Sequence, residues 1–147
     1  MERKPHACAL RRGRFSAAGQ CYLVTTVTRQ RQSVFTDLER ARCLIRCLQQ
    51  EQETGRAFTM AYVLMPDHLH WLLTLGQGRS LSVVVRAVKA VTAHQIGGVV
   101  WQRGFHDRAL RCDEDVQQVA RYVVANPLRA GLVRHLGDYP HWDAVWI

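Results

Sequence analysis

The apolar and polar residues of this chain follow two spacings, and one of them is typical of strands. Runs of β-branched and aromatic residues predict strands at residues 21–28, 58–64 and 68–75. A fourth short strand is predicted at residues 99–102. The glycine-rich and charged segment that follows, residues 103–111, predicts a connection.

The second spacing, with apolar residues three or four positions apart, predicts three helices. The first starts from a capping box formed by Thr36 and Glu39. The second begins at Ser80 or Ser82 and ends at Gly97.

The third helix is predicted from the acidic run at residues 113–115, where negative charge favours a helix start. It stops at Asn126 and Pro127. Asn126 is then expected to be the N-cap of a short final helix over residues 128–133.

The order of these elements predicts an α+β fold of the ferredoxin-like, split βαβ type. Helices would cover one face of an antiparallel sheet, with a further C-terminal helix that carries Tyr122. Because side chains alternate along a strand, Leu69 and Trp71 would pack beneath the helices. His68 and His70 would then face the opposite side of the sheet.

Length and composition bound the class of protein. A chain of 147 residues predicts one domain over residues 1–147, with residues 1–20 as a basic N-terminal arm. No apolar run approaches the roughly 20 residues of a membrane span, and the first residues do not resemble a secretory signal. We therefore expect a cytoplasmic protein without a membrane partner.

Charge adds a candidate partner. The net charge is +8, and 18 of the 20 basic residues are arginine, whose planar fork suits phosphate. Genomic codon bias can explain a preference for arginine over lysine, but it does not explain the excess of positive charge. The charge therefore favours a nucleic-acid partner.

Two pairs of polar residues indicate the chemistry. His68 and His70 share one face of a strand and are therefore a candidate pair of metal ligands. Tyr122 and Asn126 lie four residues apart and share one face of a helix. If that helix lies against the sheet, the four residues form a constellation for phosphoryl transfer, with a divalent ion beside a tyrosine hydroxyl.

The same residues have a catalytic and a simpler interpretation. As a nucleophile, Tyr122 needs help in losing its proton, and Arg121 or Arg129 could supply that help. Otherwise the tyrosine ring packs with its hydroxyl at the surface, and Asn126 only caps a helix. His106 is first interpreted as part of a solvated turn.

Four ordered blocks carry a resemblance to a known family. They are residues 19–28, residues 62–73 (YVLMPDHLHWLL), residues 101–111 and residues 121–133 (RYVVANPLRAGLV). The pattern, which spans roughly residues 11–146, resembles the single-tyrosine HUH transposases and, among them, the REP-associated tyrosine transposases.

The resemblance implies a ferredoxin-like domain that nicks and rejoins single-stranded or hairpin DNA through a 5′-phosphotyrosine. By position, Tyr122 would be the nucleophile, and His68, His70 and Asn126 would hold Mg²⁺ or Mn²⁺. Basic residues expected to contact DNA are Arg11, Arg12, Arg14, Arg86, Lys89, Arg103 and Arg129.

Two other functions stay open. One is a noncatalytic domain that binds single-stranded nucleic acid, and the other is a zinc hydrolase in which water replaces the tyrosine. The pair of histidines lacks an evident third strong ligand or carboxylate base for the zinc chemistry. We expect a monomer, with a dimer as the alternative.

Overall fold

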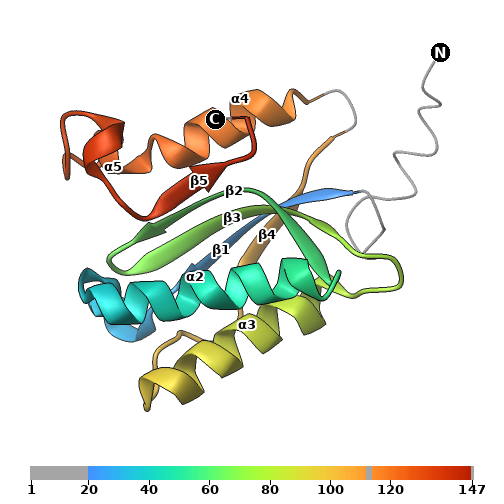
Figure 1. Ribbon diagram of the computed structural model, residues 1–147, viewed down its shortest axis with the longest axis horizontal. Helices are drawn as coiled ribbons and strands as arrows, with labels where there is room; N and C mark the ends of the chain where they lie inside the picture. Colours follow the sequence, from blue (N-terminus) through green and yellow to red (C-terminus); the bar gives the residue numbers. More distant parts are fainter. Residues whose placement is uncertain (1–19, 112–113, 147) are drawn as a thin grey trace.

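A five-stranded antiparallel sheet forms the centre of the computed structural model, which describes residues 20–111 and 114–146 (Figure 1). The strand order is β4-β1-β3-β2-β5, and every neighbouring pair is antiparallel. The strands are β1 (Cys21–Val27), β2 (Ala57–Met65), β3 (His68–Leu75), β4 (His106–Ala109) and β5 (Trp142–Ala144). The first four strands have the ferredoxin-like order, and β5 extends the sheet beyond β2.

Helices lie on both sides of this sheet. On one side are α2 (Leu38–Glu53) and α3 (Leu81–Ile96), and on the other are α4 (Val116–Val124) and the short α5 (Asn126–Arg129) (Figure 1). Three 3₁₀ turns, Arg29–Arg31, Val34–Thr36 and Leu136–Asp138, join the elements. The predicted α+β, ferredoxin-like fold with a separate C-terminal helix is confirmed. Within the described residues, no helix has both the length and the apolar character to cross a membrane.

Alternation along β3 separates two cores. Leu69, Trp71 and Leu73 are buried in the core that α2 and α3 cover. Leu72 points the other way and packs with Ala120 and Val124 of α4. The histidines share the orientation of Leu72, so the predicted split of β3 into an apolar face and a histidine face is confirmed.

The predicted fourth strand was wrong in position. Residues 99–102 form only an isolated bridge between Trp101 and Thr28, and the strand is β4, inside the predicted connection. Val99 and Val100 have high strand propensity, but Trp101 packs against Phe35 in the core instead, with ring centroids 5.4 Å apart.

Two helix starts also differ from the prediction. Asp37, not Thr36, caps α2, because its carboxylate accepts a hydrogen bond from the Arg40 backbone N–H at 3.1 Å. The Thr36 hydroxyl instead donates to the Ser33 carbonyl within the preceding 3₁₀ turn. Asn126 lies inside α5 and does not cap it, since its side-chain amide donates back to the Val123 carbonyl at 2.8 Å.

Gly76 gives a sharp test of the packing at the end of β3. A Cβ atom at this position would lie 1.9 Å from the Gly55 carbonyl oxygen. We expect Gly76→Ala to lower the free energy of unfolding by about 1–3 kcal/mol, because the backbone of the 54–56 turn must move. Gly98→Ala is the control, since a Cβ there meets nothing within 4 Å. Urea unfolding of both variants decides the matter, and equal stabilities would contradict the close approach of the two turns.

Candidate active site

His68 and His70 lie on the face of β3 that α4 covers. Their imidazole rings meet edge to face, with centroids 4.8 Å apart. Their cross-strand partners in β2 are Met65 and Val63, which both pack against Val123 of α4. The helix that carries Tyr122 therefore lies against the same face of the sheet as the two histidines.

One ring nitrogen of each histidine is occupied by a neighbouring side chain. Nδ1 of His68 lies 2.7 Å from Oδ1 of Asp67, and Nδ1 of His70 lies 2.9 Å from the Thr25 hydroxyl. The remaining nitrogen, Nε2, is thus the one that each imidazole can offer to a metal ion. Ligating histidines in proteins are commonly held in this way.

His70 is held in its neutral form. Burial, followed by repulsion from the charges of His68 and Arg129, lowers the pKa of His70 from 6.5 to about 4. A neutral imidazole keeps the lone pair that a metal ion needs. His70 is therefore ready to bind a cation near neutral pH without first losing a proton.

Tyr122 lies on the exposed side of α4, with 65% of its surface accessible. The guanidinium of Arg129 lies over its ring, 3.7 Å from the centroid. Because the same guanidinium also contributes to the pKa shift of His70, Arg129 links the tyrosine to the histidine pair. Arg121, the other arginine expected to help, is exposed on α4.

The donors around the histidines fit a divalent cation with mixed ligands. Among the described residues there is no group of three histidine, cysteine, aspartate or glutamate side chains that could hold a metal. Any further protein ligand must therefore come from another residue type. Asn126 is suitable, because its amide nitrogen is engaged with Val123 and its amide oxygen remains as an acceptor. Two imidazoles and one oxygen suit Mn²⁺ better than Mg²⁺.

Of the basic residues expected to contact DNA, Arg129 lies beside Tyr122 and acts on His70, whereas the other described ones lie elsewhere. Arg86 and Lys89 lie on α3, on the other side of the sheet, and the Lys89 ammonium donates to the carbonyls of Gln102 and Gly104. Arg103 is exposed in the same loop. Arg11, Arg12 and Arg14 lie outside the described residues.

Three residues near the histidines were not predicted from the sequence. Asp67 and Thr25 contact the two imidazoles, and Arg31 forms an ion pair with Asp67 at 3.2 Å. Of the three, Asp67 offered a usable signal in the sequence, because it directly precedes His68. His106 was expected in a turn, but it starts β4, pairs with Thr25 and is exposed.

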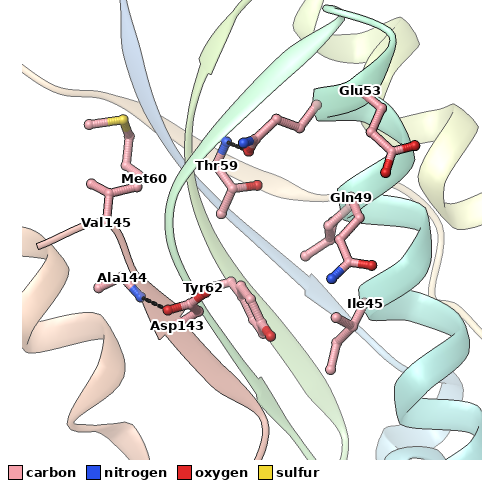
Figure 2. Close-up of a pocket in the computed structure, with 11 residues that line it drawn as sticks. Ile45, Gln49, Glu53, Thr59, Met60, Tyr62, Asp143, Ala144 and Val145 are labelled. Carbon is pink, nitrogen blue, oxygen red and sulfur yellow. Dashed lines mark hydrogen bonds between the residues drawn. The ribbon is translucent and has the colours of Figure 1, made fainter. Parts of the chain in front are cut away.

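A cavity of about 640 Å³ lies elsewhere, between α2 and strands β2 and β5 (Figure 2). Tyr62 and Asp143 line it, and Tyr62 belongs to the core that faces α2. Burial and the nearby Asp143 charge raise the pKa of Tyr62 to about 12. Since Tyr62 faces away from the histidines, this cavity is separate from the candidate site.

Two known proteins are similar to this chain in sequence. The REP-associated tyrosine transposase of Escherichia coli K12 is 32% identical over 82 residues, which cover 54% of this chain and 50% of that protein. A putative REP-associated tyrosine transposase of Haemophilus influenzae is 24% identical over 99 residues, which cover 56% of each. The chain thus spans about half the length of these curated relatives.

Two solved structures have the same fold. One is a REP-associated tyrosine transposase bound to a REP hairpin, with a TM-score of 0.77 and 24% identity, covering 97% of this chain and 82% of that one. The other is a putative transposase from Deinococcus radiodurans R1, with a TM-score of 0.54 and 23% identity, covering 76% of this chain and 93% of that one.

The model of the family described as IS200-like transposases matches residues 17–126. This range contains both histidines, Tyr122 and Asn126, and the resemblance to REP-associated tyrosine transposases is confirmed. The chain belongs to the IS200-like transposase family.

Proposed function

We propose that this protein nicks and rejoins single-stranded hairpin DNA by transesterification, with Tyr122 as the nucleophile. The observation that carries the proposal is that α4, which bears Tyr122, packs on the sheet face that bears His68 and His70. Arg129 supports it, because it contacts the tyrosine ring and its charge acts on His70.

The reaction conserves the number of phosphate ester bonds. The phenolic oxygen of Tyr122 attacks a DNA phosphorus, and the bond from phosphorus to the 3′ oxygen breaks. The tyrosine gives up its proton, the 3′ oxygen gains one, and the products are a 5′-phosphotyrosine and a free 3′-hydroxyl. A second 3′-hydroxyl then attacks the phosphotyrosine and restores a phosphodiester, so no nucleotide cofactor is needed.

The other side chains of the candidate site have distinct tasks in this proposal. Arg129 holds the ring and stabilises the negative charge that develops on the phenolic oxygen. His68, His70 and Asn126 would hold Mn²⁺ or Mg²⁺. When bound, the ion supplies Lewis-acid stabilisation of the charge on the phosphate oxygens.

We further propose hairpin DNA as the partner and a monomer as the working unit. The solved relative with the higher TM-score is bound to a REP hairpin. The net charge of +8 favours a polyanionic partner. Arg86 and Arg103 are exposed and available to phosphates, and contacts from Lys89 and from Arg11, Arg12 and Arg14 stay predictions.

A labelled hairpin with a single-stranded flank tests the proposal. The wild-type protein and Mn²⁺ are incubated with DNA labelled at either end, and products are separated under denaturing conditions. We expect the 3′-end label to become attached to the protein, while the 5′-end label leaves on a shorter strand with a free 3′-hydroxyl.

Other outcomes identify the alternative functions. Cleavage without a covalent adduct would support a hydrolase in which water is the nucleophile. Binding that weakens steeply with salt, without cleavage of any single-stranded substrate, would support a noncatalytic binding domain.

A further inference from the structure

Asp67 lies between a candidate metal ligand and a charged partner. Its Oδ1 is 2.7 Å from Nδ1 of His68, and its Oδ2 is 3.2 Å from Nε of Arg31. The two oxygens of one carboxylate therefore contact two different side chains. This arrangement fixes the plane of the carboxylate as well as its position.

The backbone of Asp67 is held just as closely. Its carbonyl oxygen accepts hydrogen bonds from both the backbone N–H of Thr28, at 2.9 Å, and the Thr28 hydroxyl, at 3.0 Å. That hydroxyl is also 2.8 Å from the Gln32 carbonyl, so it joins the β2–β3 turn to the turn after β1. Asp67 is thus connected to the rest of the sheet through both its side chain and its backbone.

The turn after β1 has an unusual shape that brings Arg31 to Asp67. Gln30 and Arg31 have φ values of 56° and 51°, a left-handed conformation that residues other than glycine rarely adopt. The turn is fixed on both sides, because Arg31 N–H donates to the Thr28 carbonyl and Arg29 N–H donates to the Val100 carbonyl. Such backbone shapes persist where surrounding contacts hold them, often at functional sites.

The charge on Asp67 determines which ring nitrogen of His68 carries the hydrogen. The carboxylate also forms an ion pair with Arg31, and an aspartate side chain is ionised near neutral pH. An ionised carboxylate can only accept hydrogen bonds. Nδ1 of His68 must therefore carry the hydrogen, which leaves the lone pair on Nε2.

We propose that Asp67, held by Arg31 and Thr28, is a positioning residue that fixes the orientation and tautomer of His68 for metal binding. The inference rests on the metal site of the proposed function. It goes beyond that function by assigning a role to a side chain that is neither the proposed nucleophile nor one of the proposed metal ligands. The contact explains why a strained turn is maintained next to the histidine strand.

The first test needs neither metal nor DNA. Nitrogen-15 NMR of the imidazole rings at pH 8 distinguishes the two neutral tautomers. We expect His68 of the wild type to carry its hydrogen on Nδ1, and Asp67→Ala to shift the population toward the tautomer with hydrogen on Nε2. His70 serves as an internal reference, because Thr25 and not Asp67 holds its Nδ1.

The second test measures Mn²⁺ affinity by electron paramagnetic resonance. We expect Asp67→Ala to weaken binding by about 10–100-fold, as loss of a residue behind a ligating histidine commonly does. Asp67→Asn, which keeps the size and one acceptor oxygen, should fall between the wild type and the alanine variant. Asp107→Asn removes the same charge from β4 and is the control, because Asp107 pairs with Val24 and lies on the opposite face of the sheet from His70.

The outcomes separate this inference from the proposed function. If both Asp67 variants bind Mn²⁺ as tightly as the wild type and the His68 tautomer does not change, the inference is overturned and the proposed function is not. Wild-type protein that does not bind Mn²⁺ at all would overturn the metal site. An effect of Asp107→Asn equal to that of Asp67→Asn would also overturn the inference, because charge and not contact would then be the cause.

Discussion

Tyr122→Phe is expected to abolish the covalent DNA adduct while leaving hairpin binding within about twofold of the wild type. The substitution removes only the phenolic oxygen, and the side chain is 65% exposed, so little packing is lost. The ring remains available to Arg129. Loss of a nucleophile typically lowers a rate by about 10³-fold or more. The measurement is single-turnover adduct formation on a 3′-labelled hairpin, with binding measured in parallel.

Tyr62→Phe is the matched control for this experiment. Tyr62 also lies on a structured element, but it faces α2 and the cavity beside β5 (Figure 2). We expect this variant to form the adduct at the wild-type rate. An adduct that forms normally with Tyr122→Phe would show that a different side chain attacks the DNA.

His70→Ala should have the second-largest effect. The substitution removes a neutral imidazole with a free Nε2 from the middle of the site. We expect Mn²⁺ affinity to fall by about 100-fold or more, since loss of a ligand should exceed the 10–100-fold cost of losing a residue behind one. Adduct formation should fall with it. Calorimetric titration with Mn²⁺ and the adduct assay measure the two effects.

A histidine on the far side of the sheet provides the comparison. His94→Ala changes an exposed position on α3, away from the face that carries His70. It should bind Mn²⁺ and form the adduct like the wild type. If His70→Ala keeps full adduct formation at limiting Mn²⁺, the pair on β3 is not the metal site.

The sequence could predict the histidine strand because several signals agree there. Alternation, apolar content and a preceding proline all define β3, and the structure begins and ends it at the predicted residues, His68–Leu75. The end of α3 was also predictable, because Gly97 follows the helix and adopts the left-handed conformation with a φ of 92°. Strong local patterns of this kind require no knowledge of distant residues.

The position of β4 could not be predicted because its pairing depends on a distant strand. Its residues, His106–Ala109, are mostly polar and exposed, and they form a strand only because the outer edge of β1 is available to them. The more apolar segment at 99–102 has the higher strand propensity but places Trp101 in the core. Tertiary contacts override local propensity at both places.

The residues that contact the histidines could not be predicted either, because they also depend on the pairing of distant segments. Thr25, Arg31 and Asp67 come together only when β1 and β3 pair, and Thr25 and His70 are 45 positions apart in the sequence. Asn126 illustrates the opposite error. An asparagine before a proline is a common start of a helix, yet here the chain continues from α4 into α5, and Asn126 bonds back to Val123.

The two outer strands of the sheet have a consequence for how copies of the protein can meet. Three of the four residues in β4 are polar, namely His106, Asp107 and Arg108. Strand β5 has three residues, with Asp143 at its centre. Short edge strands that carry charge are poor templates for the addition of a strand from another molecule. We therefore expect that neighbouring copies of the protein, even at high concentration, will not join their sheets into a continuous one or aggregate through these edges.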